Sequence, residues 1–342
     1  MQLRFIIPLL LLLTSCDVFG QSRTVTTLSG KTMGTVFHIS VIDLPEAVTA
    51  ENLGAQIEAE LKAFNDKLSN WQQDSEISKF NASGDVDWVD ASDKFYTVME
   101  ESFYIHNLSE QTFDVTLAPL IDLWGFGWKQ NDTIIPSDEA VIAALENVGM
   151  NKLLALNPTT KQIKKLKAEV SVNLSAIAKG YGIDVLAALL EKNGVKEYLV
   201  EIGGDLIAKG HNGEDKPWVV GIETPDNDGK QVEELVMISQ YGMATSGDYR
   251  NYVEKDGKRF SHIIDPVTGK PVTHNLASVT IFSDSAMRAD ALATAMMVLG
   301  VEAGLKIADK NNIAAYFLTR DGATFKATSS AQYKQLKADA GK

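Results

Sequence analysis

The spacing of apolar and polar residues predicts five helices along the chain. In each of them apolar residues recur every three or four positions, which places them on one face of a helix. The clearest example has Ile177, Tyr181, Val185 and Leu189 on one face, and it closes at Gly194, since glycine commonly ends a helix. The predicted helices cover residues 50–64, 92–108, 137–148, 173–192 and 285–299.

Shorter stretches rich in β-branched and aromatic residues predict strands, which lie mostly in the second half of the chain. Turn-forming residues at 225–229 and 256–257 join four of them into two hairpins, whereas the small residues at 242–247 are expected to form a loop. Hairpins mixed with helices favour an α+β fold over a doubly wound parallel sheet, folded as one unit with lobes. The predicted strands cover 35–42, 198–202, 218–223, 235–238, 249–254, 259–264, 278–282 and 314–319, the last being the final one.

The stretch 172–205 joins a helix directly to a strand and holds two features that folding alone does not require. Lys179 lies in the first helical turn, where the helix dipole disfavours a cation. Small residues around it leave the backbone uncovered, as contact with a phosphate or nucleotide requires. Asn173 or Ser175 is expected to cap the helix. A helix packed closely on a sheet, with Lys179 in solvent, explains the same pattern, and the stretch alone slightly favours that simpler interpretation.

The amino terminus predicts export and lipid attachment. Residues 1–15 have the form of a secretory signal, with Arg4, a nine-residue apolar run that is too short to span a bilayer, and then small residues. Residues 13–16 resemble a bacterial lipobox that ends at Cys16, the only cysteine in the chain. Asp17 resembles the signal that keeps lipoproteins in the inner membrane of Gram-negative bacteria. The chain is therefore expected at the periplasmic face of that membrane, on a tether of residues 16–24 that extends toward residue 29. The alternative is ordinary signal cleavage with a chance cysteine.

The charge of the chain narrows the range of ligands. Its formal charge is −13, and loss of Arg4 with the signal makes it −14. Phosphate contacts dominate nucleic-acid binding, so this charge argues against a nucleic-acid partner. A polyanionic ligand would need a metal ion or a few well-placed cations.

A metal site is suggested by Asp290 and Thr294, which lie one turn apart and project from the same face of the 285–299 helix. The residues between them are small, so another segment can approach closely. A carboxylate and a hydroxyl, completed by carbonyl, phosphate and water oxygens, suit Mg²⁺. The alternative is a capped helix with two incidental polar residues. Five histidines without an HExxH motif or clustered cysteines argue against zinc.

Three other residues have both a functional and a structural interpretation. Asp114 lies among apolar residues and needs a partner. Trp71 lies alone in the polar stretch 65–81, which is expected to be a loop, and there it either covers the edge of a core or stacks on a ring. His262, placed on the strand 259–264, suits a general base, although a histidine bonded to the backbone is the commoner case.

Several common enzyme classes lack support in the sequence. The glycine pairs at 203–204 and 246–247 have neither Walker A nor GxGxxG spacing. The serines at 175 and 246 lack a GxSxG context. The chain therefore does not have the sequence features of a P-loop kinase, a Rossmann enzyme or a serine hydrolase.

Eight motifs, in order over residues 25–335, resemble the ApbE family, the FAD:protein FMN transferases, also called flavin transferases. The motifs are KTMGT (31–35), DSEISKFN (74–81), FDVTLAPLIDLWGFG (113–127), NLSAIAKGYGID (173–184), YLVEIGGD (198–205), ATSGDYRNY (244–252), SHIIDPVTGKPV (261–272) and ADALATA (289–295).

The resemblance implies an α+β fold of mixed or antiparallel sheets with flanking helices over residues 25–335. It implies that the protein binds FAD and, with Mg²⁺, attaches FMN to a threonine of a partner protein and releases AMP. The implied partners are flavin-acceptor subunits of membrane redox pumps of the sodium-translocating NADH:quinone reductase (Nqr) and Rnf types. Some members instead hydrolyse FAD to FMN and AMP. A periplasmic FAD pyrophosphatase, or a flavin-binding protein without turnover, is therefore the alternative.

The resemblance also implies the site residues, carried over by position. The metal site falls on the backbone carbonyl of Ala176 with Asp290 and Thr294, and His262 is the candidate base. The family often has aspartate where this chain has Asn173, whose amide can bond the ligand but adds no charge. The flavin contacts fall on Met33, Trp71, Thr112, Phe113, Asp114, Asn173, Lys179 and Ile264.

Overall fold

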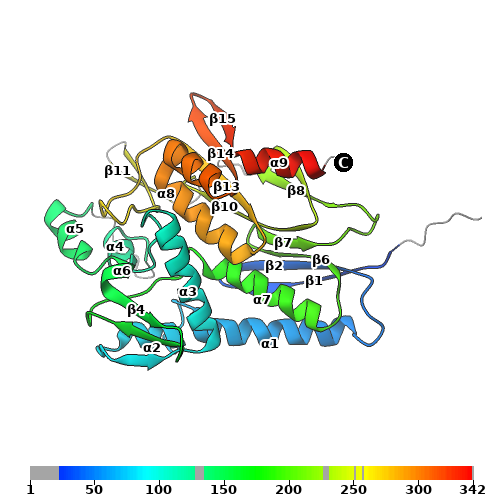
Figure 1. Cartoon of the computed structure of the whole chain (residues 1–342), viewed down its shortest axis with the longest axis horizontal. Coiled ribbons are helices and arrows are strands. Elements are labelled where there is room, and N and C mark those ends of the chain that lie inside the picture. Colours follow the sequence, from blue (N-terminus) through cyan, green and yellow to red (C-terminus); the bar gives the residue numbers. More distant parts are fainter. Residues whose placement is uncertain (1–22, 128–134, 226–230, 250–251, 256–257, 341–342) are drawn as a thin grey trace, which may run out of the picture.

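A computed structural model describes residues 23–127, 135–225, 231–249, 252–255 and 258–340 (Figure 1). Its largest element is an eight-stranded sheet whose strands follow chain order, each antiparallel to its neighbours. The antiparallel sheet and its flanking helices confirm the predicted α+β fold. The strands are β1 (Val25–Thr32), β2 (Thr35–Ile42), β6 (Glu197–Ile202), β7 (Asp205–Lys209), β10 (Gln240–Gly247), β13 (Leu276–Ser283), β14 (Ala314–Asp321) and β15 (Thr324–Ser329).

The connection from β2 to β6 forms a second lobe beside the main sheet (Figure 1). It contains a small antiparallel sheet of order β3-β5-β4 and ends with helix α7, which returns to the main sheet. Its elements are α1 (Ala50–Leu68), α2 (Glu76–Ala82), β3 (Trp88–Asp90), α3 (Asp93–Leu108), α4 (Ala118–Leu123), α5 (Asp138–Leu145), α6 (Met150–Leu153), β4 (Leu154–Asn157), β5 (Gln162–Lys165) and α7 (Ala178–Lys192).

The later connections of the main sheet carry two hairpins and a long helix. One hairpin lies between β7 and β10, and the other between β10 and β13. The predicted turns at 226–229 and 256–257 lie outside the described residues. These elements are β8 (Trp218–Glu223), β9 (Val232–Ile238), β11 (Tyr252–Lys255), β12 (Lys258–Ser261), α8 (Ala286–Lys310) and the terminal α9 (Ala331–Ala340).

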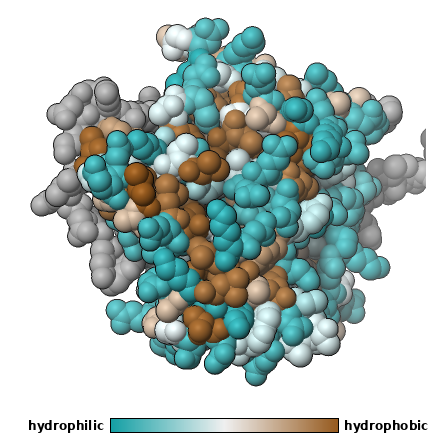
Figure 2. Space-filling model, turned by 60° about the vertical axis from the view of Figure 1, so that its left-hand side comes forward, coloured by the Kyte–Doolittle hydropathy of each residue, from teal (hydrophilic) through white to brown (hydrophobic). Residues whose placement is uncertain are grey.

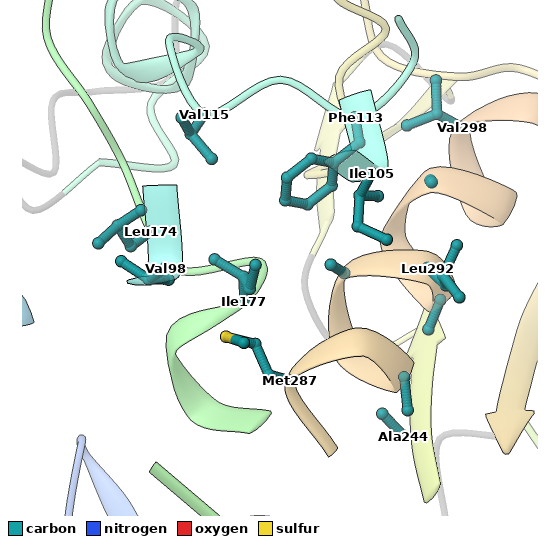
Figure 3. Close-up of a cluster of buried hydrophobic side chains, with 14 of the residues drawn as sticks. Val98, Ile105, Phe113, Val115, Leu174, Ile177, Ala244, Met287, Leu292 and Val298 are labelled. Atoms are coloured by element: carbon teal, nitrogen blue, oxygen red, sulfur yellow. The ribbon is translucent and has the colours of Figure 1, made fainter. Parts of the chain in front are cut away.

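Both faces of the main sheet are covered, because alternate residues of its strands join different cores. On β14, Phe317 packs in a core with α3 and α8, whereas Tyr316 and Leu318 pack in a core with the β8–β9 hairpin and α9. Figure 3 shows the first core, where α3, α8 and two irregular segments meet. Those segments contribute Phe113 and Ile177, so this core anchors chain that also carries predicted site residues.

Helix α8 approaches its neighbours at van der Waals distance through two glycines. A Cβ added at Gly180 of α7 would lie 2.2 Å from the carbonyl oxygen of Ala286, and one added at Gly242 of β10 would lie 2.7 Å from the nitrogen of Ala286. By length and composition α8 could cross a membrane, but 61% of its most apolar window is buried. It is therefore a core helix of the folded domain.

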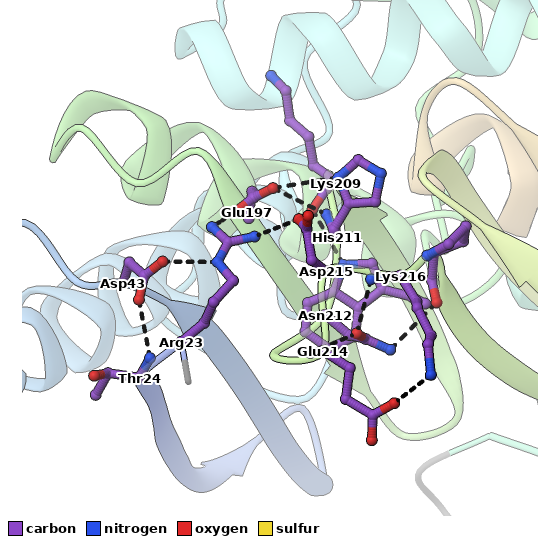
Figure 4. Close-up of polar contacts among 12 residues, drawn as sticks. Arg23, Thr24, Asp43, Glu197, Lys209, His211, Asn212, Glu214, Asp215 and Lys216 are labelled. Atoms are coloured by element: carbon purple, nitrogen blue, oxygen red, sulfur yellow. Dashed lines mark hydrogen bonds and ion pairs between the residues drawn. The ribbon is translucent and has the colours of Figure 1, made fainter. Parts of the chain in front are cut away.

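The start of β1 is held by a cluster of polar contacts around Arg23 (Figure 4). Its guanidinium donates to Asp43 at 2.8 Å and to Asp215 at 3.2 Å, and it also pairs with Glu197. The extension of the tether to residue 29 was therefore wrong, because Val25 already pairs with Ile42 in the sheet. This strand lies at the edge of the sheet and half of its positions are exposed, so its polar sequence looked like a linker.

Three other sequence-based assignments were also wrong. Residues 242–247 form strand β10 and not a loop, because small residues are needed where α8 packs on the sheet. The polar stretch 65–81 contains the end of α1 and most of α2. Strand β14 is followed by β15, so it is not the last strand.

Candidate active site

A cleft of about 660 Å³ lies where the two lobes meet, between the 112–127 segment, the start of α7, the start of α8 and the β8–β9 hairpin. Every predicted site residue within the described part of the chain lines it, although these residues come from distant positions in the sequence. They are Met33, Trp71, Thr112, Phe113, Asp114, Asn173, Ala176, Lys179, His262, Ile264, Asp290 and Thr294. Cys16 lies outside the described residues.

The segment before α7 does not form the capped helix that was predicted. The helix begins at Ala178 after Ile177, whose side chain cannot cap it. Asn173 instead accepts from the backbone N–H of Ser175 at 2.9 Å, and its own N–H donates to the carbonyl of Val115 at 2.7 Å. These bonds hold the chain before the helix in an irregular conformation, and Ala176 of this segment lines the cleft.

Two asparagines that sequence reasoning missed hold the same segment in place. Asn70 accepts from the N–H of Leu174 at 2.9 Å and donates to the carbonyl of Val172 at 2.8 Å. Asn81 makes the equivalent pair of bonds with the N–H and the carbonyl of Val172. An amide can donate and accept at once, so these two side chains make the backbone hydrogen bonds that a neighbouring strand would otherwise make. The one sequence signal that could have identified them is Asn81 itself, which is the last residue of the 74–81 motif.

Lys179 points into the cleft and pairs with Asp205, whose carboxylate is 2.9 Å away and 3% exposed. Asp205 also accepts from the N–H of Thr245 at 3.2 Å. Burial raises the pKa of this carboxyl group, while Lys179 opposes the rise. Asp205 was not among the predicted site residues, although it is the last residue of the 198–205 motif.

Asp290 is the second buried carboxylate of the cleft. Its Oδ2 accepts from the N–H of Gly180 at 2.9 Å, which fixes the side chain between α7 and α8. Burial, and then the nearby charge of Asp205, raise the pKa of Asp290 to about 7, and Lys179 opposes that rise. Two buried carboxylates thus face one lysine, which is itself partly exposed in the cleft.

Thr294 lies one turn after Asp290 on α8, and its hydroxyl lies 3.2 Å from that of Ser246 on β10. The cleft lining also includes the predicted ligand residue Ala176. Carboxylate, hydroxyl and carbonyl oxygens are hard donors that suit Mg²⁺ better than a soft metal. The chemistry of this donor set, and the excess of buried carboxylate, fit a divalent cation.

Asp114 has the partners that its apolar surroundings demanded. Its carboxylate accepts from the N–H and hydroxyl of Thr116 and from the N–H of Met150 at 3.0 Å. The carbonyl of the neighbouring Phe113 lies 2.6 Å from Nδ1 of His106, a buried histidine on α3. The 112–114 segment is therefore a rigid part of the cleft wall.

The remaining predicted residues form the more open part of the cleft. Trp71 is 73% exposed, so its ring is available for stacking. Met33 packs toward Gly182, where an added Cβ would lie 2.5 Å from its methyl group. His262 follows β12 and is not on the strand itself, and its ring meets that of Phe126 edge-on at 6.3 Å. Ile264 is buried and forms a single bridge with Pro271.

A second group of metal-ligand side chains lies away from the cleft. Glu197, His211 and Asp215 present ligand atoms within 4.8 Å of one another (Figure 4). The guanidinium of Arg23 already pairs with both carboxylates of this group. Two of these three side chains are exposed and both carboxylates are already engaged by Arg23, so we do not take this group as a candidate metal centre.

The chain is similar to known proteins over most of its length. Residues 33–317 match the sequence profile of the ApbE family. The FAD:protein FMN transferase of Haemophilus influenzae is 40% identical over 96% of each chain, and that of Escherichia coli is 39% identical over 91% of this chain and 89% of its own.

Solved structures show the same likeness. The flavin transferase ApbE from Vibrio cholerae matches with a TM-score of 0.85 at 38% identity, over 92% of this chain and 99% of its own. The apo form of the flavinyl transferase ApbE from Pseudomonas stutzeri matches with the same TM-score at 36% identity, over 92% and 97% of the two chains. These matches cover the cleft and both lobes, and the chain belongs to the ApbE family.

Proposed function

We propose that this protein uses Mg²⁺ to transfer FMN from FAD to a threonine hydroxyl of an acceptor protein, with AMP as the second product. The enzyme class, FAD:protein FMN transferase, follows from family membership and from the curated relatives. The metal, the threonine, the acceptor and the location are the proposal.

The charge of the cleft is the observation that carries the metal requirement. Two buried carboxylates, of Asp205 and Asp290, line it beside Lys179, and burial raises the pKa of both. The pyrophosphate of FAD is itself an anion, so this cleft would repel it without an added cation. Asp290, Thr294 and the carbonyl of Ala176 would hold Mg²⁺, which when bound neutralises the pyrophosphate and makes AMP a better leaving group.

The side chains of the cleft can perform the remaining steps of the transfer. The threonine oxygen forms a bond to the phosphorus on the flavin side of the pyrophosphate as the bond between that phosphorus and the bridging oxygen breaks. AMP leaves with the bonding electron pair, and His262 accepts the proton of the threonine hydroxyl. Lys179, held by Asp205, reaches a phosphate oxygen, while Trp71 and the 112–114 segment position the flavin.

The proposed location and partners rest on the amino-terminal sequence. Lipidated Cys16, followed by Asp17, would anchor the enzyme at the periplasmic face of the inner membrane, beside acceptor subunits of Nqr- and Rnf-type complexes. Cys16→Ser is expected to release the protein from the membrane fraction or to block its processing. Recovery of the wild-type protein, with Cys16 unchanged, in the soluble periplasmic fraction would contradict the lipid anchor.

The reaction is tested by incubating the protein with FAD, Mg²⁺ and a purified Rnf-type acceptor subunit. The expected result is an acceptor whose mass has increased by one FMN, together with an equal amount of AMP. Mapping by fragmentation should place the added mass on a threonine. FMN and AMP released with an unmodified acceptor would indicate a pyrophosphatase, and bound FAD without any product would indicate a flavin carrier.

A further inference from the structure

Apolar side chains reach the surface of the molecule in several places (Figure 2). One group of them is continuous with the cleft. We propose that the outer face of the β8–β9 hairpin docks the acceptor protein, and that it binds the chain segment next to the hydroxyl that receives FMN. This inference rests on the proposed function, because it identifies where the second substrate of that reaction binds.

The β8–β9 hairpin has apolar residues on both of its faces, although only the inner face is covered by other parts of the protein. Its inner residues, Val220, Ile222, Val236 and Ile238, are buried against the main sheet. Its outer face carries four exposed apolar side chains, three of which alternate with the inner residues, while Val232 joins them because the register shifts between Ile222 and Glu223. They are Val219 (54% exposed), Val232 (56%), Leu235 (63%) and Met237 (39%). A hairpin that covers a core normally turns polar residues to solvent, so this face is suited to contact another protein.

Gly221 makes this face continuous with the cleft. It lies on the outer side of β8, directly opposite Leu235, and it lines the cleft together with Glu223. A Cβ added to Gly221 would lie 3.3 Å from the side chain of Val232 and 3.9 Å from that of Leu235. Because Gly221 has no side chain, nothing separates the side chains of Val232 and Leu235 from the edge of the cleft that this glycine lines.

The occupant of this face is identified by the chemistry of the reaction. A protein acceptor must bring one hydroxyl into the cleft while its flanking residues remain at the rim, so a protein-binding surface has to adjoin the cleft. In the described structure β8 and β9 pair only with each other, which leaves main-chain groups at the hairpin edges for an extended segment. Other exposed apolar residues, such as Trp88 and Val89 on the small sheet and Leu166 just after it, contribute nothing to the cleft lining.

The test compares the wild type with the double variant Leu235→Gln/Met237→Gln, which makes both side chains polar at similar size and adds no charge. Leu166→Gln, at a residue 51% exposed on the other lobe, is the matched control. FMN transfer to a purified Rnf-type acceptor subunit is measured at saturating FAD and Mg²⁺ over a range of acceptor concentrations. Binding of the acceptor without FAD is measured by calorimetry.

The double variant is expected to raise the KM for the acceptor, and the acceptor Kd, about tenfold, which corresponds to roughly 1.4 kcal/mol of lost contact. Its FAD affinity, measured by flavin fluorescence, and its kcat at saturating acceptor should stay within about twofold of the wild type, since neither side chain lines the FAD cleft. The control should match the wild type in every measurement.

Unchanged acceptor KM and Kd in the double variant would overturn the proposal. So would a wild-type dimer that the double variant converts to a monomer without loss of acceptor affinity, because the face would then serve self-association. A wild type that binds the acceptor through this face but transfers no FMN would contradict only the proposed function.

Discussion

Two lysines lie inside this molecule in opposite electrostatic surroundings. Lys165, on β5 of the small sheet, is 1% exposed, and its ammonium group donates only to backbone carbonyl oxygens within the described residues. Lys179, in the cleft, faces the carboxylates of Asp205 and Asp290. The carbonyls around Lys165 belong to Asn81, Ser83, Ala168 and Val170.

The difference separates a structural charge from a functional one. Around Lys165, neutral dipoles satisfy every ammonium hydrogen, and burial lowers the pKa of the lysine without any need for a further ion. Around Lys179, two carboxylates share one cation, and burial raises the pKa of Asp290 to about 7. The first arrangement needs no further ion, whereas the second is expected to gain stability if another cation binds.

The largest expected effect comes from removing a carboxylate of the cleft. Asp290→Ala should lower Mg²⁺-dependent FMN transfer on the order of a thousandfold, because a bound cation supplies several kcal/mol of charge stabilisation. The fold should remain intact, and a thermal melt should show no gain in stability from Mg²⁺. The matched control is Asp184→Asn, at a half-buried carboxylate that caps α8 through Ser285, Ala286 and Met287. That variant should lose stability but keep Mg²⁺-dependent turnover. Full activity in Asp290→Ala would return this residue to a structural role.

The opposite result is expected at the other lysine. Lys165→Met keeps most of the side-chain volume but leaves four buried carbonyl oxygens without their donor. It should lower the free energy of unfolding by about 3 kcal/mol, as measured by urea denaturation. FMN transfer by the folded fraction should be unchanged, because Lys165 contributes nothing to the cleft lining. A stable but inactive variant would show that the two lysines are not separate in function.

The pH dependence of the metal-free protein sharpens the same comparison. Folded Asp290 has a pKa of about 7, against about 3.9 for an unfolded aspartate. Between these values Asp290 binds more protons in the folded state than in the unfolded state, so its contribution to the stability of the wild type falls as the pH rises from about 4 to about 7. The groups responsible are Asp205 and Asp184, which raise this pKa together with burial, against Lys179.

Asp290→Asn removes this titration. In EDTA the variant should therefore be more stable than the wild type by up to a few kcal/mol at pH 8, and by little near pH 4. Urea denaturation at the two pH values measures the difference. If the stability difference between variant and wild type were the same at pH 4 and pH 8, the pKa of Asp290 would not be raised in the metal-free folded protein. With saturating Mg²⁺ at pH 8, the wild type should regain stability and the variant should not.

The sequence predicted the cleft residues better than the local structure that presents them. The predicted residues line one cleft because ordered motifs identified the family, whereas no local pattern joins Met33 to Thr294. Asp205 was missed because a carboxylate after a strand and two glycines has no distinctive spacing, and its pairing with Lys179 exists only in the folded chain. Asn70 was missed for the same reason, since its partners are backbone atoms about a hundred residues away.

The start of α7 shows where local rules fail. Asn173 and Ser175 are good capping residues, but their turn precedes the helix by several positions. Bonds from Asn70 and Val115 hold the chain irregular there, and these tertiary contacts override the local capping preference. Strand β10 shows the same effect, because its small residues are dictated by the approach of α8 at Gly242 and not by a turn.

The smallest expected effect concerns Asn173, where the ApbE family often has aspartate. Asn173→Asp would add a carboxylate to a cleft wall that already has an excess of negative charge. Its oxygen can still accept from the N–H of Ser175, so the local turn should survive. The added charge should lower the Mg²⁺ concentration for half-maximal transfer about threefold, or roughly 0.6 kcal/mol, because the site is partly open to water. The control is Asn157→Asp, which accepts in a similar turn from Thr159 and Thr160 but lies outside the cleft lining. An equal shift in both variants would trace the effect to overall charge, whereas a higher Mg²⁺ requirement in Asn173→Asp would contradict the view that this cleft is completed by a cation.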